Sequence, residues 1–246
     1  MGKRINEVRK SRGLTADKLS ELCNINATYL RQIEGGAKMP SLPVFIDICK
    51  ALHISPDYLL QDELSENEIE EIGEAFADYN YADGEKGMSF LYNGRESVKE
   101  YICGYVRAML AGGCLFSTSD NHEAFVAYKF SKDKLPASAG FILLKTVFRT
   151  LGFKGAVNML SAIKKGGESY ETTLKKQKKP YIFVGMLVVR KQYQRQGFMR
   201  KALDIAFDEG RKCGVPVLLE TDAALKRDKY VHLGMTNIRT RKLNDS

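Results

Sequence analysis

Turn-forming residues divide the first sixty residues of the chain into short segments. The breaks are Gly13, the pair Gly35-Gly36, Pro40 and Pro56. Between them, apolar residues recur every three or four positions, which is the spacing of one helix face. The stretch therefore predicts five short helices, with a tight turn between the second and the third, packed as an all-α domain over residues 1–63.

Residues that favour helix N-termini precede three of these segments. Thr15 and Asn26 can cap the second and third helices, and Ser55 precedes a proline at a first helical position. The pattern resembles the phage-repressor-like (XRE-type) class of helix-turn-helix domains over residues 3–61. The resemblance is carried by Leu14-Thr15, Leu19, Leu22, Ile25-Asn26, Tyr29-Leu30, Gln32-Ile33-Glu34-x-Gly36, Pro40 and Ala51-Leu52-x-Ile54-Ser55-x-x-Tyr58-Leu59-Leu60.

In that class the third helix lies in the major groove of double-stranded DNA, and its first residues meet base edges. The resemblance assigns the base contacts to Ala27, Thr28 and Arg31, and places Asn26 and Tyr29 near phosphates. It also implies a homodimer on a two-fold operator. Two functions stay open, DNA binding and a helical module that dimerises or binds protein, because the net charge of this domain is only +1.

Charge is distributed unevenly along the rest of the chain. Residues 64–85 hold eight acidic residues and no basic one, whereas residues 86–246 hold 29 basic and 14 acidic residues. The acidic run has apolar residues at helical spacing, so we expect residues 66–79 to open a second domain over 64–246, with the break near Asp62–Ser65. The basic surplus favours an anionic ligand such as a phosphorylated cofactor, or forms an ordinary solvated surface.

Apolar patterning and cysteine content bear on the location of the protein. No apolar run reaches the length of a membrane span, and the N-terminal MGKRINEVRK lacks the apolar stretch of a secretory signal. We therefore expect a cytoplasmic protein with no membrane partner. The five cysteines form no CxxC pair and the three histidines lie far apart, so no metal site is expected and the cysteines are interpreted as small buried apolar residues.

Strand-like and helix-like segments alternate in the second half of the chain. This alternation predicts an α/β (α+β) domain with a central mixed sheet. The expected strands are CLFSTS and EAFVAYKF, joined as a hairpin around Asp120-Asn121, then YIFVGMLVV, Val215–Thr221 and a closing strand over Met235–Lys242. The expected helices are RESVKEYICGYVRAMLAGG, much of residues 138–178, Gly197–Gly214 and Leu225–Leu233.

The segment LVVRKQYQRQGFMR is the strongest candidate for a ligand site in this half. A buried strand runs into a turn that contains Gly197 and then into a helix, which directs backbone N–H groups to one spot at the positive end of the helix dipole. A pyrophosphate fits such a turn, and an ordinary turn with a solvated basic face is the alternative. The flanking basic residues are Arg190, Lys191, Arg195, Arg200 and Lys201. A nucleotide-binding P-loop is excluded, because GxxxxGK[ST] is absent.

Four motifs in order resemble the GNAT acetyltransferase superfamily over about residues 66–242. They are Glu74-Ala75-Phe76, Gln194-Arg195-Gln196-Gly197-Phe198, Val217-Leu218-Leu219-Glu220-Thr221 and Tyr230-x-x-Leu233-Gly234-Met235. The resemblance implies an N-acetyltransferase that uses acetyl-CoA as co-substrate and acts on a primary amine of a small molecule or peptide. It assigns the pyrophosphate, chiefly through main-chain N–H groups, to Arg195, Gln196, Gly197, Phe198, Met199 and Arg200.

The same resemblance implies roles for residues beside this turn. Val188 and Val189 would pair with the amides of the pantetheine arm as an added strand does. Tyr230 would protonate the departing thiolate or is a packed aromatic, and Glu220 would accept the proton of the amine or is a structural carboxylate. Two functions remain open, an enzyme whose DNA-binding domain localises it, and a regulator that senses acetyl-CoA or a metabolite without turnover. The intact Tyr230 and turn favour the first, whereas Met199, which stands where the superfamily has glycine or alanine, favours the second.

Overall fold

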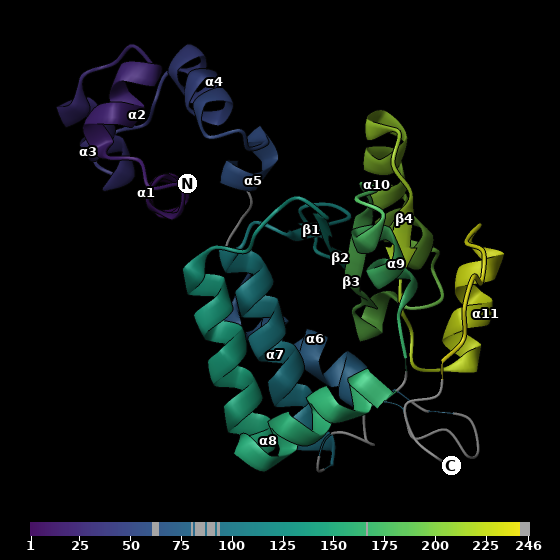
Figure 1. The fold of residues 1–246 in the computed structure, drawn as a ribbon. Helices are drawn as coiled ribbons and strands as arrows, with labels where there is room; N and C mark the ends of the chain where they lie inside the picture. The colour runs from purple at the N-terminus through teal and green to yellow at the C-terminus, as the bar shows by residue number, and fades with distance from the viewer. Residues whose placement is uncertain are drawn as a thin grey trace. The chain divides into compact units, whose positions relative to one another are not determined.

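The chain forms two compact units, Met1–Glu63 and Leu64–Ser246, each with its own hydrophobic core. The computed structural model describes residues 1–60, 64–79, 81, 87, 92, 94–165 and 167–241. Figure 1 shows the elements of both units along the chain. Within this described part, none of the helices has the length and apolarity that crossing a membrane requires.

The first unit, unit 1, is built from helices alone, as the sequence predicts. Its helices are α1 (Gly2–Ser11), α2 (Ala16–Leu22), α3 (Ala27–Glu34), α4 (Leu42–Ala51) and α5 (Pro56–Leu60). Thr15 Oγ1 accepts a hydrogen bond from Lys18 N at 3.1 Å and caps α2, and Asn26 Oδ1 accepts one from Thr28 N at 2.7 Å and caps α3. The residues predicted to start these two helices therefore do so through their side chains.

A buried ion pair joins the first and third helices of unit 1. Arg9 Nε lies 2.6 Å from Glu34 Oε1 and Arg9 Nη2 lies 2.9 Å from Glu34 Oε2, and the two side chains are only 9% and 5% exposed. Arg9 Nη1 also donates to Leu14 O, and Asn6 Nδ2 donates to Glu34 Oε2. The pair thus holds α1 against α3 and fixes the backbone just before α2.

We expect the loss of one partner of this pair to be costly. Glu34→Gln leaves the Arg9 guanidinium buried without a countercharge, which typically costs about 3–5 kcal/mol of stability. Urea unfolding of the full chain, followed by circular dichroism, measures the change. The control Glu21→Gln removes an exposed carboxylate that pairs with Lys18, and should cost less than about 1 kcal/mol. Equal losses in the two variants would contradict a structural role for the buried pair.

The second unit, unit 2, contains the mixed sheet that the sequence predicts. Its strands are β1 (Leu115–Ser117), β2 (Ala124–Phe130), β3 (Ile182–Val189) and β4 (Val217–Leu219). They lie in the order β1-β2-β3-β4, with β1–β2 and β2–β3 antiparallel and β3–β4 parallel. The hairpin expected around Asp120-Asn121 is confirmed by the pairing of β1 with β2.

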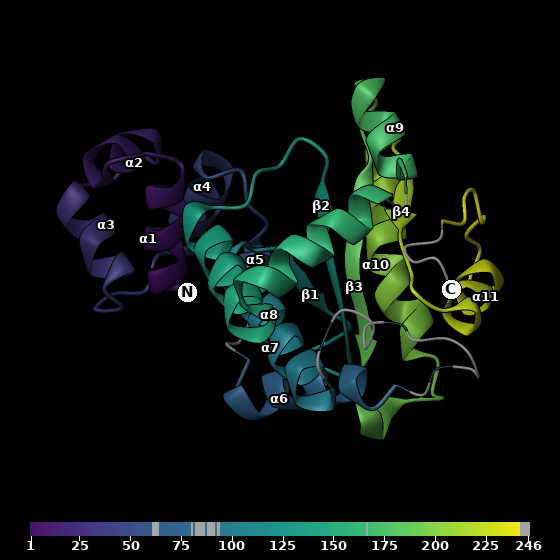
Figure 2. The ribbon, with the colours of Figure 1, turned by 60° about the horizontal axis from the view of Figure 1, so that its bottom comes forward.

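Helices cover both faces of this sheet. They are α6 (Glu66–Ala77), α7 (Arg95–Ala111), α8 (Ala137–Lys165), α9 (Tyr170–Lys176), α10 (Phe198–Cys213) and α11 (Ala224–His232), with a short 3-10 helix η2 (Lys191–Tyr193). α6 and α7 share one core with the sheet, and α10 packs on the opposite face (Figure 2). Gly152, with φ 65° and ψ 177°, breaks α8 into two rods that meet at an angle (Figure 1).

Phe148 and Phe153 stack across the break in α8, with ring centres 6.1 Å apart. The break therefore leaves two stacked rings on the surface of α8, and Phe148 and Phe153 are 42% and 74% exposed.

The prediction of a closing strand over Met235–Lys242 is wrong for residues 235–241, which form no strand. Residues 235–241, MTNIRTR, contain only two apolar residues, Met235 and Ile238, so pairing this segment to the sheet would bury little apolar surface, and Ile238 is 56% exposed. The segment is held by side chains instead, because Arg239 and Arg241 donate to backbone carbonyls of the connection between α8 and α9. Lys242 lies outside the described residues.

The cysteines only partly follow the prediction that they are buried. Cys23, Cys49 and Cys103 are buried, Cys114 is half-buried and Cys213 is exposed at the end of α10. The interpretation as small buried apolar residues is therefore confirmed for three of them and wrong for Cys213.

Candidate functional site

The first candidate site is the exposed face of α3 in unit 1. Thr28 and Arg31, three residues apart, are exposed, whereas Leu30 and Ile33 on the other face are completely buried in the core. The fold therefore brings Thr28 and Arg31 together on one solvent-facing surface, as a recognition helix requires.

Three of the residues predicted to contact DNA have partners within unit 1. The Asn26 side chain is occupied as the cap of α3, and Tyr29 OH donates to Met39 O at 3.3 Å. Arg31 Nη2 lies 3.1 Å from the Asp17 carboxylate of α2. Sequence reasoning missed Asp17, because nothing in a helical pattern tells which residue of α2 faces α3.

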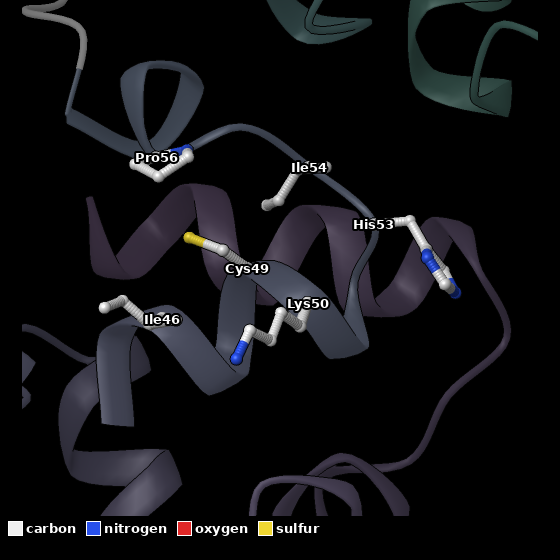
Figure 3. Close-up of a pocket in the computed structure, with 6 residues that line it drawn as sticks. All are labelled: Ile46, Cys49, Lys50, His53, Ile54 and Pro56. Atoms are coloured by element: carbon white, nitrogen blue, oxygen red, sulfur yellow. The ribbon is translucent and has the colours of Figure 1, made fainter. Parts of the chain in front are cut away.

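A hollow in unit 1 lies between α4 and α5 (Figure 3). It is lined by Ile46, Cys49, Lys50, His53, Ile54 and Pro56. The lining is mostly apolar and shares no residue with the face of α3. The hollow is therefore separate from the residues predicted to meet DNA.

The second candidate site begins in unit 2, where β3 and β4 separate. β4 pairs only with the first three residues of β3, from Ile182↔Val217 to Val184↔Leu219. β3 continues to Val189, and among the described residues no strand pairs with this remaining part on the β4 side. Ligands of open α/β sheets bind beyond the carboxyl ends of such parallel strands.

A β-bulge at Gly185 interrupts the alternation of β3. The register with β2 shifts by one residue here, so Gly185 has no residue opposite it. Val184 consequently belongs to the core under α10 and Met186 to the core under α6 and α7, although residues two apart normally share a face. A Cβ atom at Gly185 would lie 2.2 Å from the Tyr105 hydroxyl, so the bulge requires glycine.

The register also determines which backbone groups face the unpaired edge of β3. Arg190 N donates to a backbone carbonyl on the β2 side, and Val188, two residues earlier, is directed the same way. The N–H and C=O groups of Leu187 and Val189 therefore point to the unpaired edge, where Gln194 Nε2 donates to Val189 O at 3.3 Å. Of the two residues predicted to pair with a ligand, Val189 faces this edge and Val188 faces β2.

The turn between β3 and α10 directs backbone N–H groups to one side. Arg195 (φ 65°) and Gly197 (φ 83°) are left-handed, and Gln196 between them is not. Such alternation turns successive N–H groups inward, which makes an anion-binding concavity. No described residue accepts a hydrogen bond from the N–H groups of residues 195–199, and no side chain caps α10. The turn and the dipole of α10 therefore favour an anion at the same spot.

Most of the basic side chains around this turn are open to solvent. The exposed ones are Lys191, Arg195, Arg200 and Lys201. Arg190 is buried instead, and its Nε donates to Glu71 Oε2 at 2.8 Å. The prediction that Arg190 adds positive charge to the turn is therefore wrong, because a carboxylate already neutralises it.

A half-buried ionic cluster holds the beginning of this turn. Arg190 Nη2 lies 2.7 Å from Glu71 Oε2, and Arg190 Nη1 lies 3.5 Å from Glu68 Oε1. Glu68 also contacts His122 Nδ1 at 2.9 Å. Its carboxylate accepts a hydrogen bond from Ser65 N, which completes the capping box at the start of α6. Burial opposes the ionisation of Glu68, but the hydrogen bonds from His122 and Ser65 prevail and lower its pKa to about 2. The cluster thus ties α6 to the β1–β2 turn and to the end of β3.

This cluster makes unit 2 sensitive to acid. Because the folded pKa of Glu68 lies below its ordinary value of 4.5, its contribution to stability is complete above that pH and is lost as the pH falls toward 2. Between pH 5 and pH 2 the wild type should therefore lose roughly 2–3 kcal/mol more free energy of unfolding than Glu68→Gln. Urea unfolding at each pH measures this.

The control variant for this pH series is Glu70→Gln, which removes an exposed carboxylate from the same helix. It should follow the wild type at every pH. Parallel losses in the wild type and Glu68→Gln would show that the Glu68 cluster does not form.

The two predicted catalytic residues both follow β4. Glu220 comes directly after the strand, and its Oε2 lies 2.6 Å from Arg241 Nη2. Tyr230 is half-buried on α11. Burial, together with the nearby Asp222 carboxylate and Tyr79, raises the pKa of Tyr230, so its phenol stays protonated at neutral pH. The phenol therefore holds its proton more tightly than a solvent-exposed tyrosine, and Glu220 is engaged with a guanidinium.

Comparison with known proteins identifies unit 1. Residues 2–65 match the family described as "Helix-turn-helix domain". This part of the chain is a helix-turn-helix domain, and the match supports DNA binding and a role in the regulation of transcription. A comparison of the chain with curated proteins gives no match.

Proposed function

We propose that the chain is an acetyl-CoA-dependent N-acetyltransferase joined to a domain that binds a specific DNA sequence. The observation that carries the enzymatic part is the β3–α10 turn, whose N–H groups at residues 195–199 converge beside the unpaired edge of β3. The family match of residues 2–65 supports the DNA-binding part.

The turn and the strand edge suit the two chemically different parts of coenzyme A. A pyrophosphate is accepted by the converging N–H groups of residues 195–199, with the exposed Arg195 and Arg200 adding positive charge. The pantetheine arm is extended and carries amides, so it can lie along β3 as an added strand. We assign that pairing to Leu187 and Val189, whose backbone groups face the unpaired edge.

The proposed reaction is a direct transfer. A neutral amine attacks the thioester carbonyl, a C–N bond forms, the C–S bond breaks and the thiolate leaves. Tyr230 donates its phenolic proton to the thiolate, and Glu220 accepts the proton that the amine loses. Because Glu220 is paired with Arg241, this second step requires the pair to open.

Gly197 provides the direct test of the turn. Gly197→Glu places a carboxylate where the pyrophosphate would bind, so acetyl-CoA binding by the full chain should be lost in titration calorimetry. The control Gly214→Glu makes the same change at the other end of α10. Both glycines are left-handed, and a Cβ at either meets nothing within 4 Å, so backbone strain and added charge are matched. Equal binding by Gly197→Glu and the wild type would contradict the assignment.

Turnover separates the two functions that the sequence leaves open. The wild type should transfer the acetyl group to at least one member of a panel of amines and lysine peptides. Binding of acetyl-CoA without transfer, combined with an effect of acetyl-CoA on DNA affinity, would replace the enzyme with a sensor.

For unit 1 we propose that α3 enters the major groove. Thr28 and Arg31 would meet base edges together with the half-buried Ala27, while Asn26 and Tyr29 lie toward phosphates. Arg31 must then exchange its exposed pair with Asp17 for DNA, which costs little because such pairs contribute at most about 1 kcal/mol. A homodimer on a two-fold operator is part of this proposal.

Arg31→Ala tests the DNA contact. Duplexes are first selected from a random pool with the full-length protein at low salt, and the best duplex is then titrated. Loss of a base contact should cost about 1–3 kcal/mol and relax the preference at one position. The control Lys50→Ala removes an exposed positive charge from α4 and should leave affinity nearly unchanged. If the pool yields no enriched duplex, unit 1 is a protein-binding or dimerisation module.

A further inference from the structure

Two tyrosine rings and a carboxylate enclose one ammonium group in unit 2. Lys226 Nζ lies 4.1 Å from the centre of the Tyr79 ring and 4.9 Å from that of Tyr81. It also lies 2.8 Å from Asp222 Oδ1. We call Tyr79, Tyr81 and Asp222 the amine cage. Ring faces and a carboxylate are the groups that bind organic ammonium ions in proteins.

Contacts among the two rings and the carboxylate help to hold the cage in shape. Tyr79 and Tyr81 meet edge to face, with ring centres 4.9 Å apart, so they present two faces at an angle. Tyr81 OH donates to Asp222 Oδ2 at 2.6 Å, which leaves Oδ1 for the ammonium. The Lys226 side chain is only 16% exposed, so its charge is largely removed from water. The cage therefore offers a desolvated place for one positive charge.

One group proposed for acetyl transfer, Tyr230, lies beside the same cage. Asp222 follows the carboxyl end of β4 by three residues, and Tyr79 and Tyr81 follow α6. Tyr230 is close enough to Asp222 and Tyr79 for these groups to raise its pKa. An ammonium in the cage is thus near the phenol that would protonate the leaving thiolate.

We propose that the amine cage is the acceptor site, that it selects unbranched primary alkylammonium groups, and that Lys226 occupies it until an acceptor displaces it. The inference rests on the proposed function. Lys226 itself is the ligand chemistry that fits, an –NH₃⁺ at the end of a four-carbon chain. A small diamine and the lysine side chain of a peptide both carry this group.

Occupation by Lys226 has a kinetic and an energetic consequence. A tethered group competes at an effective concentration that is typically in the millimolar range, so external amines bind weakly while Lys226 is in place. An acceptor that fills the cage also leaves the Lys226 ammonium without its carboxylate. The site therefore responds only to amines that are abundant or that make further contacts.

Lys226→Met tests this directly, because it keeps most of the length of the side chain and removes its charge. Binding of n-butylamine to the full chain is measured by calorimetry without acetyl-CoA. The variant should bind it at least about tenfold more tightly than the wild type, a change of 1.4 kcal/mol. Lys226→Arg, which keeps the charge, should show no gain. The double variant Lys226→Met with Asp222→Asn should lose this gain in affinity. Neutral n-butanol should bind no variant more tightly than it binds the wild type.

A diamine and an Nα-blocked lysine peptide, titrated in parallel, distinguish the two sources of the ammonium by their relative affinities. The proposal is overturned if Lys226→Met gains no affinity, or if Lys226→Arg gains as much. If Lys226→Met does not fold, Lys226→Gln, which can still donate to Asp222, serves in its place. Acetyl-CoA binding and transfer are measured separately. A gain in amine affinity in Lys226→Met, with no binding of acetyl-CoA, supports the amine cage and refutes the transferase. Binding of acetyl-CoA, with no gain in amine affinity, supports the cofactor site and refutes the amine cage.

Discussion

Backbone pairing along β3 is the constraint on which unit 2 depends. The strand is paired with β2 over its whole length and with β4 over only three residues. Its first part therefore anchors the sheet, and its second part keeps one edge whose N–H and C=O groups pair with no described strand. Since buried backbone groups require partners, this edge must be met by solvent or by a ligand. The turn before α10 begins where that edge ends, so both halves of the candidate site follow from one strand.

Side chains from distant segments fix where the strand ends. The cluster of Arg190 with Glu68, Glu71 and His122 joins residues that lie 54 to 122 positions apart in the sequence. A charged group buried in this way is tolerated because every charge has a partner. The basic side chains that follow, within residues 191–201, take no part in the cluster and remain exposed. A buried cation that holds the structure, Arg190, is thus followed within a dozen residues by cations that are exposed to solvent.

Features set by neighbours in the sequence could be predicted, and features set by distant contacts could not. The caps Thr15 and Asn26 act on backbone groups two or three residues away, so the helices of unit 1 were within reach of a local argument. The strand–glycine–helix turn at Gly197 is local in the same sense. The pairing of Arg9 with Glu34, by contrast, depends on how α1 packs on α3, although Glu34 belongs to a motif that the sequence displays.

The same distinction explains the errors in unit 2. The closing strand was predicted from the alternation of strand-like and helix-like segments. Pairing, however, is decided by the apolar surface that can be buried, and this segment offers little beyond Ile238, which stays exposed. The amine cage was not expected at all, because Tyr79, Asp222 and Lys226 come from segments that only the fold brings together. Gly185 stands in an apolar run where nothing in the pattern distinguishes a bulge from an ordinary strand residue.

That bulge makes the length of β3 matter more than its composition. Regular pairing through Gly185, without the bulge, would exchange the faces of every residue that follows, so Leu187 and Val189 would turn toward α6 and α7 while Met186 and Val188 would turn toward α10. The backbone groups would be exchanged as well, and the unpaired edge would present the amides of different residues. Losing Gly185 together with the bulge would keep every face, so homologous chains should vary freely in which apolar residues they use here, and those that lack the bulge should be one residue shorter between Ile182 and Val189.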